Sequence, residues 1–467
     1  MDAAVQIRVR DVQAGVRPVQ LRLPFRFGAS TLTACPQLFV RAEVEVTGRG
    51  VAHGWAAELM VPKWFDKRPE LSPSANVEHL ARSMELARSA YAGDTTATPF
   101  RLFCRHYQAL RAEARACDLT ELSADFGQAV LDRAVLDATC RALGVSFFEA
   151  ARRNVFGLED TELASDMRGW DWTAWLAQLR PLHAIDVRHT VGLLDEIETV
   201  RYADEGLPVT LPAVIERYGH RYFKIKLGGD PGQDIERLRA ALATIAQRVS
   251  DARYTLDANE QYADRDALER LLQGLRDLPR PLYIEQPLPR EASLALTLNS
   301  LRSPAPLLMD EADGTLEAFV QGREVGWSGV SSKGCKGLYK ALINRARCDR
   351  WNGECGEARY FMSAEDLTCQ AGVSLQQDLA VAALLGLTHG ERNGHHYGSG
   401  FGSAPTFESR AFATAHADLY EFAAGSPRLR IRAGAVALES LFKPGFAHGA
   451  DPDITTLQPL ATGAALL

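Results

Sequence analysis

The chain has 467 residues, of which 46% are hydrophobic and 24% are charged, as in an ordinary globular protein. A chain of this length can bury a large core, so disorder, collagen and coiled coil are excluded as descriptions of the whole. The formal net charge of −7 argues against nucleic-acid binding and against a polybasic membrane-binding mode, since both need clustered positive charge.

The sequence predicts a cytoplasmic protein that does not span a membrane. No apolar run approaches the roughly 18 residues of a transmembrane helix. The first residues, MDAAVQIRVRDVQ, alternate in polarity and carry too much charge for a signal peptide. The eight cysteines are scattered without a CxxC pair, which indicates free thiols in a reducing compartment.

Residues 1–155 are predicted to form an α+β domain. Four β-rich segments occupy roughly the first 60 residues: VQIRVRDV, VQLRLPF, LFVRAEVEV and VAHGWAAEL. Helical spacing follows at 76–91 and at 125–143, and the second helix is expected to end at Gly144. Residues 156–187 carry three tryptophans within six positions and are interpreted as an insertion or a packed connection.

From residue 188 to about residue 415, short apolar runs alternate with helical patterns. Seven β–α units are visible, and an eighth strand is expected within 390–400. Repeated units of this kind mean parallel strands with right-handed crossovers. We therefore predict a (β/α)8-type barrel, or its (β/α)7β variant. A doubly wound open sheet is the alternative, weakened because no GxGxxG follows a strand.

Charged side chains stand at the ends of five successive predicted strands. Lys226, Asp257, Glu285, Asp310 and Lys333 follow one another at intervals of 31, 28, 25 and 23 residues, about one β–α unit each. The carboxyl ends of barrel strands form the rim that holds the active site in such folds. We therefore expect these five side chains to converge.

Three carboxylates on one rim would repel each other unless a cation lies between them. Oxygen ligands without a nearby His or Cys favour Mg²⁺, with Mn²⁺ as the alternative. The sequence therefore predicts Asp257, Glu285 and Asp310 as metal ligands. For a lone acid such as Asp257 a helix N-cap would be the simpler interpretation, but the set of three favours the metal.

The segment KIK places Lys224 and Lys226 on the same side of a strand, pointing into the barrel. On a half-exposed antiparallel strand these lysines would simply lie in water. Inside a barrel, burial lowers the pKa of a lysine, so that it can act as a general base. Lys226 and Lys333 come from opposite sides of the ring. They are predicted to serve the two faces of an α-carbon, while the metal stabilises the enolate.

These motifs resemble those of the enolase superfamily, in its muconate lactonizing enzyme-like subgroup within the mandelate racemase/muconate lactonizing enzyme family. The residues that carry the resemblance are KIK at 224–226, DANEQY at 257–262, EQP at 285–287, DE at 310–311 and Lys333. The segment 434–452 also resembles the C-terminal Pro-Gly segment of that family.

The resemblance implies a barrel under an α+β capping domain, to which residues 416–467 would return. It implies Mg²⁺ on Asp257, Glu285 and Asp310, with Lys226 and Lys333 as the acid/base pair. Lys224 would neutralise the carboxylate of a small-molecule substrate, and loops near 25–28 and 63–66 would close over it.

Other positions differ from the family pattern. The seventh strand, YFMSAED, lacks the His that the mandelate racemase subgroup requires; its Glu365 is expected to meet the substrate or to orient Lys333. Lys336 is a rival for the role of Lys333, because a lone Gly337 follows where the family has a Gly pair. The three histidines in 389–401 suggest a substrate-contacting loop, or a second metal site as the alternative.

Racemisation or epimerisation, dehydration and cycloisomerisation share the enolate step, so the predicted enzyme is an isomerase or a lyase. Two alternatives stay open: a Schiff-base lyase or aldolase with Lys333 as nucleophile, and a non-catalytic barrel. A homo-oligomer is expected, as for most soluble enzymes of this kind.

Overall fold

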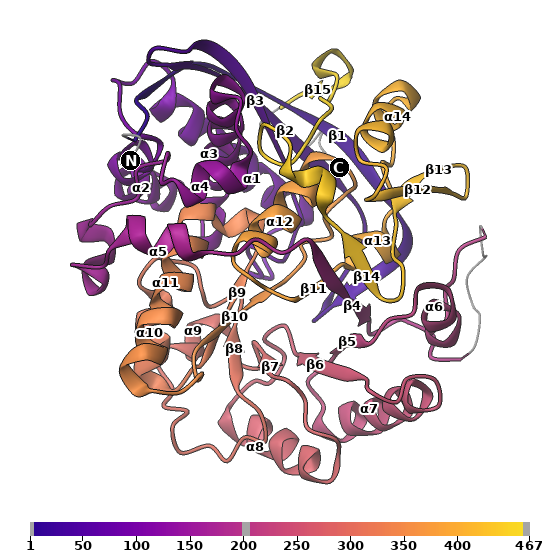
Figure 1. The fold of residues 1–467 in the computed structure, drawn as a ribbon. Helices are drawn as coiled ribbons and strands as arrows, with labels where there is room; N and C mark the ends of the chain where they lie inside the picture. The colour runs from indigo at the N-terminus through magenta and orange to yellow at the C-terminus, as the bar shows by residue number, and fades with distance from the viewer. Residues whose placement is uncertain (1–3, 199–205, 461–467) are drawn as a thin grey trace.

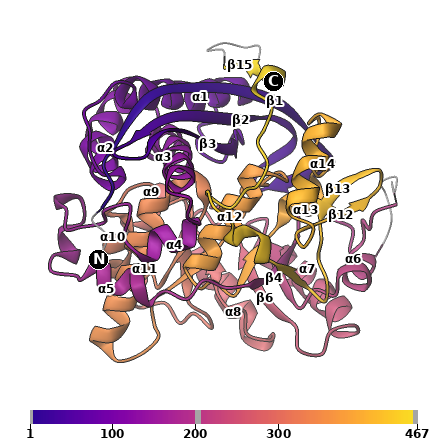
Figure 2. The same ribbon diagram turned by 45° about the horizontal axis from the view of Figure 1, so that its top comes forward.

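The computed structural model describes residues 4–198 and 206–460. Its N-terminal part is an antiparallel sheet of order β15-β1-β2-β3, with helices packed against it. The long strands arch over the molecule, and the barrel lies below them (Figure 2). The elements are β1 (Ile7–Phe27), β2 (Ser30–Val46), β3 (Gly50–Leu59), α1 (Pro73–Tyr91), α2 (Pro99–Ala116), α3 (Glu121–Leu143) and α4 (Phe147–Arg152).

Two of the predicted N-terminal strands are in fact one. VQIRVRDV and VQLRLPF both lie within β1, whose pairing with β2 continues through Gly15 and Pro18. Proline is tolerated in an edge strand, and β15 (Gln458–Pro459) covers the outer edge of β1 at Gly15 and Val16. Register shifts between Val9 and Asp11 and between Gln20 and Phe25 bend the strand instead of ending it.

The predicted helices of this part are confirmed in place. Helix α3 ends at Gly144, whose φ of 67° is the left-handed C-cap that glycine favours. Helix α3 packs so closely on β3 that a Cβ on Gly54 would lie 2.1 Å from Ala138 N. Helices α1, α2 and α3 each begin with a Ser or Thr N-cap whose hydroxyl accepts a backbone hydrogen bond.

The tryptophan-rich stretch forms a 3₁₀ turn, η1 (Glu162–Met167), and a short helix, α5 (Trp172–Gln178). Trp172 and Trp175 are buried, and Trp175 Nε1 donates a hydrogen bond of 2.9 Å to Asp349 Oδ2. The stretch thus packs against the helix that carries Asp349.

A closed barrel of eight parallel strands forms the centre of the molecule (Figure 1). The strands pair in chain order, and β11 pairs with β4 to close the ring, which rules out the open doubly wound sheet. The strands are β4 (Ala184–Val191), β5 (Tyr222–Lys226), β6 (Arg253–Asp257), β7 (Ile284–Glu285), β8 (Leu307–Met309), β9 (Gly329–Ser332), β10 (Phe361–Ala364) and β11 (His389–Glu391).

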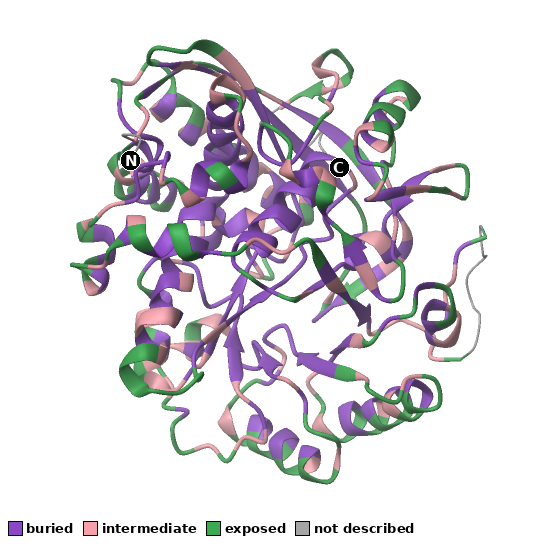
Figure 3. Ribbon diagram, in the orientation of Figure 1, coloured by how far each residue is buried: buried purple, intermediate pink, exposed green. Residues whose placement is uncertain are grey.

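Helices surround this ring. Their bounds are α6 (Leu211–Tyr218), α7 (Pro231–Ala246), α8 (Arg265–Gly274), α9 (Arg290–Ser293), α10 (Ala318–Val325), α11 (Leu338–Cys355), α12 (Val373–Leu384) and α13 (Asn393–Tyr397). After α9 the segment 294–301 is irregular, because Thr297, Asn299 and Ser300 favour turns. The strands are buried and the outer faces of the helices are exposed (Figure 3).

The C-terminal part contacts both the barrel and the N-terminal sheet. Its elements are α14 (Thr406–Ala415), β12 (Tyr420–Ala423), β13 (Ser426–Leu429), β14 (Ala435–Ala437) and β15. Strand β14 adds antiparallel to β4. Arg17 of β1 forms a buried two-point ion pair with Glu408 of α14, at 2.7 and 2.8 Å. Phe446 stacks on Phe147 at 3.9 Å between ring centroids.

Within the described ranges, no helix is long and apolar enough to cross a bilayer. All eight cysteines lie in those ranges, and none is joined to another in a disulfide.

Candidate active site

The strand register brings the five predicted rim residues to one end of the barrel. Lys226 pairs with Asp257 across β5 and β6, and Asp257 pairs with Glu285 across β6 and β7. Asp310 directly follows β8, and Lys333 directly follows β9. All five side chains are at most 5% exposed. The five side chains therefore lie together at one end of the barrel, as the sequence predicts.

Two short ion pairs stand on opposite sides of this rim. Lys226 Nζ lies 2.5 Å from Asp257 Oδ2 and 2.9 Å from Asn259 Oδ1. Lys333 Nζ lies 2.5 Å from Asp310 Oδ2. Strands β5 and β9 are four positions apart in the ring of eight, so the two ammonium groups approach the axis from opposite directions.

Lys224 lies one layer deeper, on the barrel axis. Its Nζ contacts four buried carboxylates: Glu365 at 2.6 Å, Glu285 at 2.7 Å, Asp257 at 2.9 Å and Glu391 at 3.0 Å. Although burial opposes the charge, these carboxylates hold the pKa of Lys224 well above its ordinary value. Lys224 is therefore an ammonium that neutralises acids beneath the rim.

The carboxylates differ in how well they are compensated. Lysines hold the pKa of Asp257 and of Asp310 below the ordinary value, despite burial. Glu285 accepts no hydrogen bond, and its contact is the ion pair from Lys224. Burial and the nearby Asp257 and Glu365 raise the pKa of Glu285 well above its usual range. Glu285 is thus the acid of this site that most lacks a positive partner.

The three acids fit a hard divalent cation in chemistry. Their donors are all oxygens, and Glu285 Oε1 is buried without a partner. Among residues 4–198 and 206–460, however, no three His, Cys, Asp or Glu side chains converge into a preformed metal cage. The reason is that Lys224, Lys226 and Lys333 turn the acids onto their ammonium groups.

The sequence-based expectation of a lowered pKa is wrong for Lys224 and Lys333 in this arrangement. Burial was expected to lower their pKa, yet Asp310 holds the pKa of Lys333 above its ordinary value. The attraction of an adjacent carboxylate exceeds the desolvation of the amine. As drawn, Lys333 is an ammonium.

Aromatic side chains of the N-terminal domain cover both rim lysines. Lys226 Nζ lies 5.6 Å from the ring centroid of Phe25, and Lys333 Nζ lies 4.4 Å from that of Trp64. The Phe25 ring packs against the tilted ring of Tyr397, with 4.3 Å between the ring centroids. Both rings belong to the segments near 25–28 and 63–66 that the sequence singled out as covering loops.

Hydrogen bonds connect the segment near 63–66 to the barrel. Arg290 Nη2 donates to Trp64 O at 2.9 Å, and Arg290 Nη1 donates to Phe65 O at 2.8 Å. Glu260 of the DANEQY motif holds the same guanidinium through two hydrogen bonds of 2.8 Å. Lys67 adds a hydrogen bond of 2.7 Å to Asn259 O. The loop that carries Trp64 is therefore closed on the rim.

Glu365 lies beneath Lys224 rather than beside Lys333. It accepts hydrogen bonds from Lys224, from Tyr283 at 2.8 Å and from Ser363 at 2.7 Å, and it also pairs with Arg188. These partners hold its pKa well below the ordinary value. Sequence reasoning missed Arg188, although it is an inward position of β4 by the two-residue period of a strand.

Lys336 reaches the same acid as Lys333, from further behind the rim. Its Nζ donates to Asp310 O at 3.0 Å and to Ser331 Oγ at 2.8 Å, and it pairs with Asp313 at 2.8 Å. Ser331 Oγ in turn donates to Asp310 Oδ1 at 2.5 Å. Lys333 makes the shorter contact with the Asp310 carboxylate, so the geometry favours Lys333 for the rim position.

The histidines of 389–401 do not gather around one point. The His189 ring stacks on His220 and meets His396 edge to face, whereas the His395 ring meets Tyr218 edge to face. His389 faces Arg188, at 2.9 Å from its Nη1. No metal-ligand cluster forms from them within the described chain, so the second-metal alternative gains no support.

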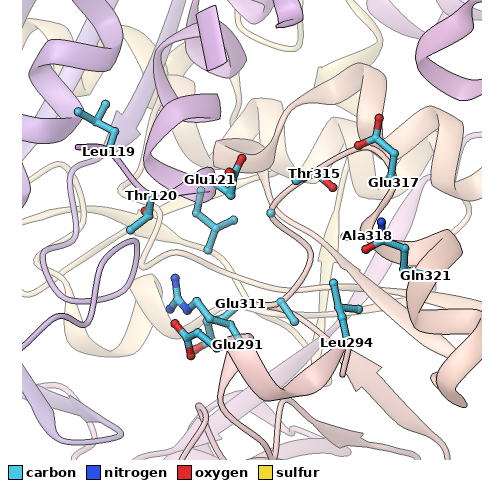
Figure 4. A pocket seen from close by; sticks show the side chains of 14 residues that line it. Leu119, Thr120, Glu121, Glu291, Leu294, Glu311, Thr315, Glu317, Ala318 and Gln321 are labelled. Carbon is cyan, nitrogen blue, oxygen red and sulfur yellow. The ribbon is translucent and has the colours of Figure 1, made fainter. Parts of the chain in front are cut away.

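A cavity of about 600 Å³ lies at the outer side of the rim (Figure 4). It is walled by the start of α3 and by the loops that follow β7 and β8. Glu311, beside the predicted ligand Asp310, lines it, and its Oε1 accepts a hydrogen bond of 3.1 Å from Asn259. The cavity therefore borders the rim beside Arg290.

The family model "enolase C-terminal domain-like" matches residues 210–330, the segment that holds Lys226, Asp257 and Glu285. This segment of the chain is therefore similar to that family, and the whole chain has the fold of the solved structures described below.

One relative of known name matches part of the chain. The chain is 39% identical over 100 residues to the L-Lys-D/L-Arg epimerase of Methylococcus capsulatus, a match that spans 21% of this chain and 24% of the epimerase.

Solved structures share nearly the whole fold. Muconate lactonizing enzyme from Pseudomonas fluorescens, complexed with muconolactone, superposes with a TM-score of 0.64 at 16% identity, covering 95% of this chain and 97% of that one. A dipeptide epimerase from Enterococcus faecalis, complexed with Mg and L-Leu-L-Tyr, gives a TM-score of 0.61 at 15% identity, covering 94% and 99%.

Proposed function

We propose that this protein is a divalent-metal-dependent isomerase or lyase that removes or replaces the α-proton of a small carboxylate. The observation that carries the proposal is the placement of Lys226 and Lys333 on opposite sides of one buried rim, each against a carboxylate. Two amines that approach from opposite directions can serve the two faces of one carbon.

Lys333, which Asp310 keeps as an ammonium, is in the form that delivers a proton to an α-carbon. Lys226 would take the proton from the other face once its nitrogen is released from Asp257 as a neutral amine, so that the configuration inverts at that carbon. Lys224 supplies a fixed positive charge below the rim, which favours a bound substrate carboxylate. The closed cover of Phe25 and Trp64 excludes water from the carbon being exchanged.

Mg²⁺ would be held by Asp257, Glu285 and Asp310. When bound, it supplies positive charge that lowers the energy of negative charge developing on the substrate carboxylate. Glu285 supports this assignment, because its buried Oε1 has no hydrogen-bond partner among the described residues.

The test is α-proton exchange in D₂O with Mg²⁺, followed by NMR and mass spectrometry. The panel would hold dipeptides, N-acylamino acids, sugar acids and lactone acids. Lys226→Met and Lys333→Met are expected to lower exchange at least 10³-fold, each from one enantiomer. Lys443→Met is the matched control, because Lys443 lies away from the rim and donates to Ala415 O.

Other outcomes would point elsewhere. Exchange that survives chelation, with borohydride trapping of substrate on Lys333, would replace this proposal with a Schiff-base lyase. Exchange that neither lysine variant changes would overturn the acid/base assignment. Size-exclusion with light scattering tests the expected homo-oligomer separately.

A further inference from the structure

Another cavity, of about 430 Å³, lies at the end of the barrel opposite to the rim. Its walls are the residues that enter strands β7, β8, β10 and β11, together with the C-terminal half of α11. Helix α11 follows β9 and returns to the amino ends of the strands, so all of these walls meet at that end. Catalytic residues of such barrels lie at the carboxyl ends of the strands. The cavity is therefore separate from the site described above.

The buried ionic side chains in the centre of the barrel lie between this cavity and the rim. His389, in the wall of the cavity, meets Arg188 at 2.9 Å. The hydroxyl of Tyr283, also in the wall, donates to Glu365 at 2.8 Å, and Glu365 pairs with Lys224. Because these side chains fill the barrel axis, a molecule in the cavity does not contact the rim lysines.

Two arginines and a histidine present N–H groups at the cavity. Arg359 is exposed, and it pairs with no carboxylate of the described residues. Arg345 Nε is enclosed and has no acceptor within residues 4–198 and 206–460. Burial lowers the pKa of His389 to about 3, so its ring is neutral. Since its Nδ1 accepts from the Arg188 guanidinium, its Nε2 carries the proton and is a donor.

The negative charge in the wall is already compensated. Asp349 Oδ1 pairs with Arg345 at 3.1 Å, and Asp349 Oδ2 accepts a hydrogen bond of 2.9 Å from Trp175 Nε1. The rest of the wall offers mostly apolar and aromatic surface, from Leu282, Pro306, Tyr360, Phe361, Met362 and Leu387. The cavity therefore combines spare positive charge and N–H donors with an apolar wall.

We propose that this cavity binds a small aromatic carboxylate, at a site distinct from the rim. A guanidinium forms strong hydrogen bonds with a carboxylate, and two of them can form in parallel. The ring of such a ligand would lie on the apolar wall, and the volume is in the range of small-molecule pockets. Arg345 and Arg359 would repel a cation. The proposal does not depend on the reaction at the rim, since the ligand is not the substrate.

The first test is calorimetric titration of the Mg²⁺-loaded protein with 4-bromobenzoate. Arg359→Gln is expected to weaken binding at least about tenfold, the value of a hydrogen bond to a charged group. Arg359 is exposed, so the substitution leaves the fold intact. Arg350→Gln is the matched control, because Arg350 lies on α11, pairs with Glu354 and does not line the cavity. The cationic analogue 4-bromobenzylammonium should bind at least about tenfold more weakly than 4-bromobenzoate to the wild type.

The rim also attracts carboxylates in the proposed function, so the two places must be told apart. Lys333→Met should bind 4-bromobenzoate as the wild type does. In crystals soaked with the same compound, the anomalous signal of bromine is expected between Phe361 and Leu387.

Three results would overturn the proposal: no binding in solution, equal binding by wild type and Arg359→Gln, or bromine at the rim alone. Failure of α-proton exchange would refute the proposed reaction and leave this site unaffected.

Discussion

Lys224 and Glu365 meet at 2.6 Å in the centre of the barrel, where each is almost completely inaccessible to solvent. Barrel interiors of this kind are usually filled by branched apolar side chains. Here the layer below the rim is ionic, with Arg188 and Glu391 completing the contacts of the pair. The rim residues therefore lie above a buried layer of charged side chains, and these side chains compensate one another's charges.

Removing one charge of that buried ionic layer should strongly destabilise the protein. Glu365→Gln leaves Arg188 and Lys224 with less compensation, and breaking a buried pair typically costs about 3–5 kcal/mol of unfolding free energy. Chemical denaturation at pH 7 measures the loss. Glu354→Gln, which removes an exposed partner of Arg350, should change stability by less than about 0.5 kcal/mol. Equal effects of the two variants on stability would contradict the prediction that the buried ion pairs stabilise the fold.

Mg²⁺ should stabilise the protein, and the effect should depend on Glu285. A ligand present at one hundred times its dissociation constant adds about 2.7 kcal/mol to the unfolding free energy. Thermal unfolding with and without Mg²⁺ is therefore expected to show a rise of several degrees in the wild type. Glu285→Gln should lose that response.

Without the metal, Glu285→Gln should be as stable as the wild type or more stable. The reason is that burial and neighbouring acids already oppose the Glu285 charge, as its raised pKa indicates. A Glu285→Gln protein that kept the full Mg²⁺ response would refute the ligand role. The exposed Glu354→Gln serves again as the control.

The contact between α3 and β3 should tolerate no side chain at residue 54. A Cβ on Gly54 would lie 2.1 Å from Ala138 N and 2.2 Å from Ala134 O, which are backbone atoms that cannot turn away. Gly54→Ala should lower the unfolding free energy by at least about 2 kcal/mol, since overpacking forces backbone shifts. Gly353→Ala, in α11 with open space around its Cβ, should raise stability by about 0.5–1 kcal/mol. Urea denaturation of both variants checks the pair.

Acid should destabilise the protein through its buried histidines. Burial lowers the pKa of His395 to about 3 and that of His220 to about 4, with nearby Arg22 and Arg428 adding to the effect on His395. Since the folded pKa is depressed, the unfolded chain binds more protons below about pH 6.5, and stability is lost as the pH falls from there.

This loss can be measured at one histidine. Between pH 8 and pH 5, His395→Phe should lose about 1–2 kcal/mol less unfolding free energy than the wild type. The substitution keeps a ring against Tyr218. His53→Gln, at a half-exposed histidine of β3, should follow the wild-type curve. An unchanged pH dependence in His395→Phe would show that this histidine is not kept neutral by the fold.

Much of this arrangement could be predicted along the chain. The intervals from Lys226 to Lys333 follow the length of a β–α unit, and the fold places those residues on one rim because parallel strands bring equivalent ends together. Helix ends such as the one at Gly144 could also be predicted, since the residues that cause them are close in sequence. The merging of two predicted strands into β1 could not be predicted, because it depends on pairing with β2, which continues through Gly15 and is not a local interaction.

The sequence by itself determined the elements, their order and the rim on which the acids and lysines meet, because periodicity and strand parity act over a few residues. The tertiary structure decided which charges compensate which. It turned Lys224 onto four carboxylates, left Glu285 without a hydrogen bond and brought Trp64 over Lys333. These relationships depend on the closure of the barrel and on a covering segment, around Trp64, that is far from the rim residues in the chain. Coulombic and packing energies act through space, so the spacing of residues along the chain does not encode them.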